Sequence, residues 1–153
     1  MDTEPPRPQP RIVAPGDATA LRPFGIDMRM MLGAEATGGS FSLVIATLDP
    51  GQGPPPHRHA DRDEYFFVLE GDYAIAVDGR EQRIGPGTLV YVPRGTVHGF
   101  QNCGATPGRM LEWTIPGENS RYFAAVDAME RAGGFDPVRF AAINAEFATE
   151  FVG

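Results

Sequence analysis

The chain contains no lysine, and its thirteen cationic residues are all arginine. A lysine Schiff base is therefore excluded, and with it pyridoxal-phosphate or imine chemistry. A phosphate-binding P-loop is excluded for the same reason, because that loop requires a lysine. The chain also lacks any run of basic residues and has a net charge of −7, so we do not expect nucleic acid as a partner.

Cysteine and long apolar runs are scarce as well. Cys103 is the single cysteine, so no disulfide can form within the chain, and we interpret it as a small buried residue rather than a ligand or nucleophile. No apolar run approaches the ~20 residues that cross a membrane. Residues 1–10 hold four prolines and no apolar core of a signal peptide. We therefore expect a cytoplasmic protein with no membrane partner.

The patterns that are present predict a small β protein. With 153 residues the chain can bury one core, and we divide it into a disordered Pro-rich tail at 1–12, a β-barrel domain at 13–117 and a C-terminal helical extension at 118–153. Short apolar and β-branched runs predict strands at 28–32, 41–48, 64–70, 73–77, 88–92, 97–102 and 110–115. Their connections are too short for crossover helices, which indicates an all-β antiparallel sandwich or barrel.

After the last predicted strand the sequence changes to a helical pattern. Asn119 or Ser120 is the expected cap of a helix that runs to Ala132 and stops at Gly133. Asp136, which precedes a proline, predicts the start of a second helix. Residues 150–153 are short and apolar, and either dock as a strand or lie on the surface.

All three histidines of the chain fall in one constellation with a glutamate: His57, His59, Glu64 and His98. Residues two apart on a strand face the same side, so His57 and His59 point into the same space. Glu64 opens the next predicted strand, and His98 arrives from a later one. Imidazole nitrogen plus one carboxylate oxygen suits Fe, Mn, Co, Ni, Cu or Zn, so we predict one divalent transition metal on these four ligands.

Four protein ligands leave one or two coordination positions open for water, dioxygen or a substrate oxygen, which favours Lewis-acid or redox chemistry. A closed structural zinc site would more often use cysteine. Glu64 has two possible roles that the sequence does not separate. It either stays on the metal, or it leaves the metal and acts as general base on an acidic hydroxyl.

Residues near the constellation carry weaker signals. Arg58 and Arg62 are expected to face solvent, and Arg94 either binds an anionic substrate or forms a surface salt bridge. Four further side chains either line a pocket for an aromatic substrate or pack in the core, and the sequence does not decide between the two roles: Trp113, Phe100, Met110 and Tyr91. An outward apolar row on the predicted strand at 64–70 needs cover and predicts a homodimer: Tyr65, Phe67 and Leu69.

Two blocks of sequence carry a family resemblance. The first is Gly51-x5-His57-x-His59-x4-Glu64-x6-Gly71, and the second is Gly87-x5-Pro93-x-Gly95-x2-His98-x3-Asn102. They resemble the two motifs of the cupin superfamily, which implies an antiparallel jelly-roll β-barrel and the four metal ligands named above. The helical C-terminal tail is similar to that of small bacterial single-domain cupins described as quercetin-dioxygenase-like.

Cupins include dioxygenases, isomerases, epimerases, decarboxylases and non-enzymatic binders. Our hypothesis is a metal-dependent dioxygenase for a small aromatic or enolizable substrate, with Glu64 as the catalytic base. The alternative is a non-oxidative cupin, which is either a Lewis-acid isomerase or lyase, or a non-catalytic protein that binds a small molecule. A sensor that acts directly on genes would need a basic DNA-binding segment, which the sequence does not contain.

Overall fold

The computed structural model describes residue 4 and residues 7–153, and the elements named here belong to that part of the chain. The strands are β1 (Thr19–Leu21), β2 (Asp27–Leu32), β3 (Ser42–Leu48), β4 (His57–His59), β5 (Asp63–Glu70), β6 (Tyr73–Val77), β7 (Arg80–Ile84), β8 (Leu89–Val92), β9 (His98–Asn102), β10 (Gly108–Ile115) and β11 (Thr149–Phe151). The helices are α1 (Glu118–Gly133) and α2 (Pro137–Glu146), and short 3-10 turns lie at Pro15–Asp17, Pro23–Gly25 and Ala34–Thr37.

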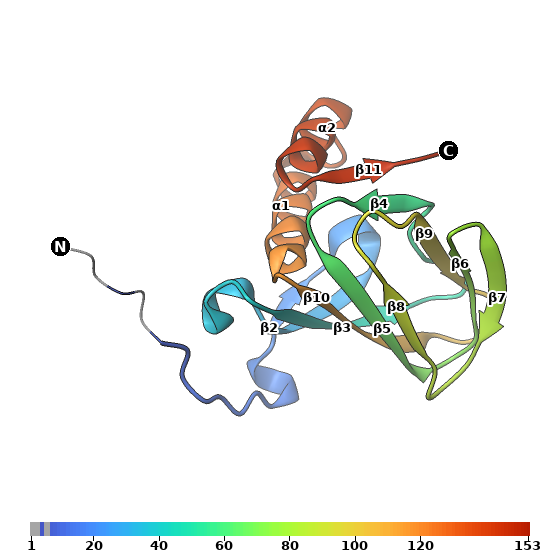
Figure 1. Ribbon diagram of the computed structural model, residues 1–153, viewed down its shortest axis with the longest axis horizontal. Coiled ribbons are helices and arrows are strands. Elements are labelled where there is room, and N and C mark those ends of the chain that lie inside the picture. The colour runs from blue at the N-terminus through green and yellow to red at the C-terminus, as the bar shows by residue number, and fades with distance from the viewer. Residues whose placement is uncertain (1–3, 5–6) are drawn as a thin grey trace.

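The predicted tail at 1–12 falls partly on residues 1–3 and 5–6, which lie outside the described residues. The described residues 7–12 carry no helix or strand, and they run away from the two sheets (Figure 1). The division of the chain into a tail, a β-barrel domain and a helical extension remains a prediction.

Within residues 7–153 the strands form two antiparallel sheets (Figure 1). One has six strands in the order β1-β2-β3-β10-β5-β8, and the other has five in the order β11-β4-β9-β6-β7. This confirms the predicted antiparallel β fold with a helical C-terminal segment, and the arrangement is consistent with a jelly roll. In that same part of the chain, neither helix combines the length and the apolar character needed to span a membrane.

Strand alternation decides which side chains point between the sheets. In β3 every second residue is buried, namely Ser42, Val44, Ala46 and Leu48. In β5 the same alternation buries Glu64, Phe66 and Val68. Because the side-chain period of a strand is two, Glu64 shares the inward face with the apolar core.

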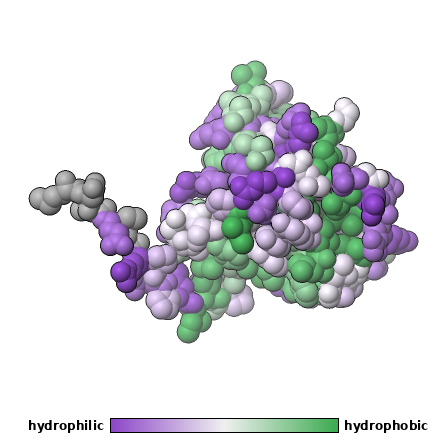
Figure 2. All heavy atoms as spheres, viewed as in Figure 1, coloured by the Kyte–Doolittle hydropathy of each residue, from purple (hydrophilic) through white to green (hydrophobic). Residues whose placement is uncertain are grey.

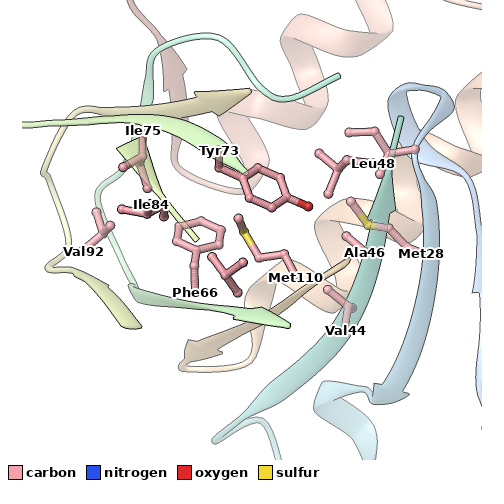
Figure 3. Close-up of a cluster of buried hydrophobic side chains, with 12 residues drawn as sticks. Met28, Val44, Ala46, Leu48, Phe66, Tyr73, Ile75, Ile84, Val92 and Met110 are labelled. Atoms are coloured by element: carbon pink, nitrogen blue, oxygen red, sulfur yellow. The ribbon is translucent and has the colours of Figure 1, made fainter. Parts of the chain in front are cut away.

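One hydrophobic core joins the inward faces of both sheets. In Figure 3, Met28, Val44 and Leu48 of the six-stranded sheet belong to the same cluster as Tyr73 and Ile75 of the five-stranded sheet, and the ring of Tyr73 extends toward Leu48. Full burial of one such side chain contributes about 1.5–3 kcal/mol, so the shared core fixes how the sheets pack. The packing in turn holds β4 and β9 of one sheet against β5 of the other.

The outer face of the six-stranded sheet carries an aromatic row. Tyr65 of β5 stacks between Trp113 of β10 and Tyr91 of β8, with ring centroids 5.2 Å and 5.0 Å away. Apolar surface gathers over β5 and β8 in Figure 2, where Leu89 is 56% and Tyr91 51% exposed. Of the outward row that was expected to need a partner surface, the ring of Tyr65 is therefore covered in part by Trp113 and Tyr91 of the same sheet.

Two turns have the backbone geometry that their residues predict. Asp78 and Gly79 adopt φ values of 52° and 76° between β6 and β7, as a hairpin turn of this type requires. Gly95 adopts φ of 82° three residues before β9 and donates a 2.6 Å hydrogen bond to the carbonyl oxygen of His59. This glycine turn brings the loop before His98 back to β4.

The expected cap of the first helix is wrong. α1 begins at Glu118, and Gly117 is its N-cap without a side-chain cap. Gly117 is pressed against the backbone of Phe41, where a Cβ would lie 2.6 Å from the carbonyl oxygen. The side chains of Asn119 and Ser120 are used elsewhere, since Ser120 accepts a hydrogen bond from the backbone of Ala34. The second helix starts as predicted.

The C-terminal segment docks as a strand, which is one of the two alternatives left open. β11 pairs with β4 so that Thr149 faces His59 and Phe151 faces His57. Figure 1 shows α1, α2 and β11 together at the same end of the molecule as β4. A second apolar cluster that includes Tyr122, Val126, Met129 and Phe147 holds this end together.

Candidate metal centre

The structure brings the four predicted metal ligands together. His57 and His59 come from β4, Glu64 from β5 and His98 from β9. All four are buried, and one ligand atom from each lies within 4.8 Å of the others. β4 and β9 are antiparallel neighbours, and the pairing of His57 with His98 joins the two halves of the constellation. The described residues thus form a cluster that is able to hold a metal ion.

Two of the histidines engage a backbone carbonyl through Nδ1. Nδ1 of His57 lies 2.8 Å from the carbonyl oxygen of Pro55, and Nδ1 of His98 lies 2.9 Å from that of Thr96. A carbonyl oxygen only accepts hydrogen bonds, so both Nδ1 atoms carry hydrogen. Nε2 is then the ligand atom that each ring offers.

His59 follows the same rule through a hydroxyl. Oγ1 of Thr149 donates to the carbonyl oxygen of Phe147 at 3.0 Å, so it accepts from Nδ1 of His59, which lies 2.9 Å away. Nε2 of His59 is buried and has no hydrogen-bond partner among the described residues. Burial of such an unpaired atom costs free energy, and a cation would satisfy its lone pair. The residues therefore fit a divalent metal.

Burial keeps two of the rings neutral. It is the largest cause that lowers the pKa of His57 to about 4, and the neighbouring His98 lowers it further. Burial is also the largest cause that lowers the pKa of His59 to about 3, and Arg62 adds to this shift. Both imidazoles are thus uncharged at neutral pH, which is the form that binds a metal.

Glu64 and His98 form the charged pair of the cluster. Nε2 of His98 donates to Oε1 of Glu64 at 2.6 Å. Burial raises the pKa of Glu64, but His59 and His98 outweigh it, so the pKa lies below its ordinary value. Burial lowers the pKa of His98, but the hydrogen bond to Glu64 outweighs it, so this pKa is raised. With both ring nitrogens donating, His98 must lose a proton before it can bind a metal.

The expectation that Arg62 faces solvent is wrong. Arg62 is 1% exposed, and it donates to Oδ1 of Asn119 (2.5 Å), the carbonyl oxygen of Phe147 (2.6 Å) and Oγ1 of Thr149 (2.9 Å). α1 and the segment that ends in β11 supply these acceptors, so the guanidinium is satisfied without water. Nothing in the local sequence around Arg62 indicates partners so far along the chain.

The structure also places the other residues for which the sequence provided only a weak indication. Arg94 forms a surface ion pair with Asp63 at 3.2 Å, which favours the salt-bridge alternative. Arg58 faces solvent as expected and pairs with Glu150. Cys103 is exposed, which contradicts the expected buried position. It follows Asn102, which is buried at the end of β9, so the alternation of the strand directs the side chain of Cys103 outward.

Two polar residues that the sequence analysis did not assign to the site lie beside Glu64. Nδ2 of Asn119 donates to Oε2 of Glu64 at 2.5 Å and to Oε1 of Glu112 at 2.8 Å. Burial, followed by the neighbouring Glu64, raises the pKa of Glu112 well above its ordinary value. A sequence signal for Glu112 exists, because it alternates with Met110 and Thr114 on the inward face of β10. Asn119, taken as a helix cap, has no such signal.

A cavity of about 60 Å³ opens beside the cluster, and His57, His59, Glu64, Glu112 and Asn119 line one part of it. The rest of the lining is largely apolar and includes the rings of Phe24, Phe66, Phe100, Tyr122, Phe123 and Phe151. The rings contributed by α1 and β11 show that the C-terminal segment covers this end of the sheets. A wider hollow of about 200 Å³ lies toward residues 51–55 and shares several lining residues with the cavity.

The four side chains considered as pocket lining divide into two pairs. Phe100 and Met110 line the cavity. Trp113 and Tyr91 belong instead to the outer aromatic row around Tyr65. Trp113 and Met110 are three residues apart on β10, so they face opposite sides of the sheet.

Residues 44–114 match the family model described as a cupin domain. This segment is a cupin domain. It includes the four clustered residues and Glu112, whereas Asn119, Tyr122 and Thr149 follow it in the chain. Some of the side chains that surround the four clustered residues therefore lie outside residues 44–114, the segment that matches the family model.

The cupin domain is similar to curated relatives of different kinds. The tetracenomycin polyketide synthase protein TcmJ of Streptomyces glaucescens is 33% identical over 76 residues, which are 50% of this chain and 50% of that protein. Quercetin 2,3-dioxygenase of Bacillus subtilis is 32% identical over 73 residues, which are 48% of this chain and 22% of that protein. The chain therefore matches half or less of the length of these relatives.

A solved structure shares the fold of the cupin domain. KdgF from Halomonas sp. superimposes with a TM-score of 0.63 at 18% sequence identity, and the match covers 71% of this chain and 94% of that chain. At this identity the likeness concerns the fold alone.

Proposed function

We propose that the chain is a metal-dependent dioxygenase for a small aromatic or enolizable molecule. The observation that carries the proposal is the buried cluster of His57, His59, Glu64 and His98 beside a cavity walled by aromatic rings. A divalent transition metal held there would supply Lewis-acid polarisation and, if redox-active, reactivity toward dioxygen. The likeness to quercetin 2,3-dioxygenase supports this choice of chemistry.

The side chains of the cavity supply binding, orientation and proton transfer. The aromatic walls exclude water and hold a flat ring against the cluster. The lowered pKa of Glu64 keeps its carboxyl ionised at neutral pH, so it can take the proton of an acidic substrate hydroxyl. Asn119, held by Arg62, fixes the orientation of the Glu64 carboxylate.

A non-oxidative cupin is the second candidate, and one observation favours it. Glu64 and Glu112 both accept from Nδ2 of Asn119, and their pKa values are shifted in opposite directions. An ionised carboxyl beside a protonated one is a pair that can move a proton within a substrate. A Lewis-acid isomerase or lyase would use such a pair, whereas a protein that only binds a small molecule would not need it.

Elemental analysis of untagged protein, beside a His98→Ala control, tests the proposal first. We expect about one equivalent of Fe, Mn, Co, Ni or Cu per chain and its loss in the control. Oxygen uptake by the loaded protein is then measured with flavonols, diketones and catechols. Absence of uptake across this panel would count against a dioxygenase, and zinc as the native metal would favour the isomerase or lyase.

A further inference from the structure

We propose that Glu112 selects the substrate: its free carboxyl oxygen hydrogen-bonds an oxygen substituent of a small single-ring ligand, whose second oxygen faces the His57–His59–Glu64–His98 cluster. The part concerning the second oxygen rests on the proposed metal-centre function. The part concerning Glu112 stands on its own contacts.

Glu112 occupies a position where a carboxyl group is costly. It lies in the middle of β10, where its Cα pairs with Val44 on one side and Phe66 on the other, and it is 5% exposed. Its neighbours on the inward face of β10 are Met110 and Thr114. An apolar residue would pack here without the cost of removing a carboxyl group from water. A compensating role is therefore expected for Glu112.

The contacts of Glu112 satisfy only half of its carboxyl group. Oε1 accepts from Asn119 at 2.8 Å, while Oε2 is buried and has no hydrogen-bond partner. Among the described residues, two other buried side-chain polar atoms lack a partner: Nε2 of His59 and the hydroxyl of Tyr73. The His59 atom is explained by a metal, and Tyr73 does not line the cavity. Oε2 of Glu112 is thus the unpaired oxygen of a cavity-lining residue that a metal does not explain.

Glu112 does not duplicate the role of Glu64. The group of residues close enough to share a metal ion consists of the three histidines and Glu64, without Glu112. Both oxygens of Glu64 have donors, Oε1 from His98 and Oε2 from Asn119. The hydroxyl of Tyr122, another lining residue, is taken up by Asn144 at 2.7 Å. A ligand polar group at this end of the cavity therefore meets Glu112.

The cavity limits what reaches that oxygen. Its volume of about 60 Å³ is about four to six times the roughly 10–15 Å³ that one water needs on the same measure. One ring fits this space, and any larger part of a ligand would have to extend toward the hollow at residues 51–55. The aromatic lining favours a flat ring, and the free carboxyl oxygen requires a hydroxyl or carbonyl group on it.

Binding of matched phenols tests the assignment. Zinc-loaded protein, which is redox-inert, is titrated by calorimetry under argon with phenol, catechol, resorcinol and hydroquinone. Each dihydroxybenzene adds one hydroxyl to phenol at a different position. We expect one isomer to bind about tenfold more tightly than phenol, because its second hydroxyl pairs with Glu112. That preference should vanish in Glu112→Met and persist in Glu112→Gln, whose amide can both donate and accept.

A stability measurement separates this role from a structural one. Because Oε2 of Glu112 is unpaired, Glu112→Met should raise the melting temperature of the metal-free protein by about 2–4 °C. A lowered melting temperature would mean that the carboxyl is there for the fold, and it would overturn the proposal. A preference over phenol that is equal in the wild type and Glu112→Met, or no preference for any isomer, would overturn it as well.

Oxygen uptake keeps the two proposals apart. A Glu112-dependent preference together with no uptake by the Fe-, Mn-, Co-, Ni- or Cu-loaded protein would leave the selecting role in place and remove the dioxygenase. Oxygen uptake with catechol at the same rate and Michaelis constant in Glu112→Met as in the wild type would support the dioxygenase and remove the selecting role of Glu112.

Discussion

Oγ1 of Thr149 lies 2.9 Å from Nδ1 of His59 and accepts the ring hydrogen, so a residue of the last strand sets the tautomer of a candidate metal ligand. The same oxygen accepts from Arg62 at 2.9 Å. This bond leaves Nε2 of His59 with its lone pair available inside the cluster. Supports of this kind typically change metal affinity by about 10- to 100-fold when they are removed.

Thr149→Val should therefore lower metal affinity by about 10- to 100-fold while the protein stays folded. Valine keeps the shape of threonine but cannot accept the hydrogen bond. Competition with a chelating dye measures the affinity. Thr47→Val, on the outward side of β3, is the matched control and should leave the affinity unchanged. Equal affinities in the two variants would show that Thr149 does not orient the ligand.

Arg62→Met should destabilise the protein by about 3 kcal/mol or more. It removes a buried cation that donates to acceptors in α1 and next to β11, and it leaves Oδ1 of Asn119 without its donor, whereas the carbonyl oxygen of Phe147 and Oγ1 of Thr149 each keep one donor. Arg58→Met is the matched control, because Arg58 forms an exposed pair with Glu150 that contributes at most about 1 kcal/mol. Urea unfolding of both variants gives the comparison, and similar losses would contradict the buried network.

The metal-free protein should lose stability as the pH falls from about 7 to about 5. In the unfolded chain His57 and His59 take up protons around their ordinary pKa of 6.5, whereas in the folded protein they do so only at about 4 and 3. Between these values the unfolded state binds more protons, so acid favours unfolding. Each histidine contributes up to about 1.4 kcal/mol per pH unit in this window.

His98 does not reverse that slope. Its pKa is raised in the folded protein, so it is protonated in both states below 6.5, and its contribution to stability is lost only as the pH rises. Urea unfolding at several pH values measures the slope. His59→Leu should remove about half of it, since one of the two titrating rings is gone. Glu112, whose raised pKa adds stability as the pH falls, opposes this slope, so the difference between the wild type and His59→Leu carries the test. Equal slopes in the two proteins would contradict the neutral buried state of His59.

Much of this fold follows from local sequence pattern. The alternation in β3 and β5, the Asp78-Gly79 turn and the spacing of His57 and His59 each depend on residues within a few positions of one another, so they can be predicted from the sequence. The four clustered residues come from strands whose inward faces are set by the same alternation.

The support around the cluster depends on packing between distant segments. Arginine is usually exposed, and Arg62 is buried only because α1 and the segment before β11 place oxygens around it. Asn119 lies in the first turn of a helix, where a capping role is the local expectation. Arg62 stands two residues before Glu64, but no local pattern indicates its distant acceptors, and no spacing rule links Asn119 to Glu64. These contacts become evident only once the sheets and helices are packed.

We expect a homodimer that uses the outer face of the six-stranded sheet. Tyr91 and Leu89 are half-exposed there, next to the aromatic row around Tyr65. Light scattering should give about 33 kDa, twice the chain mass of 16.5 kDa. Tyr91→Arg should shift the mass toward the monomer, and Val138→Arg, at an exposed apolar position on α2, should not. A wild-type monomer at micromolar concentration would rule out this interface.

The pairing of β11 with β4 has a consequence for the order in which the site is built. Thr149, which orients His59, is synthesised after all four clustered residues, since it stands 51 positions beyond His98. A chain still emerging from the ribosome can bring its histidines together before that threonine exists. We therefore expect full affinity for a metal only after β11 has been made and has docked on β4.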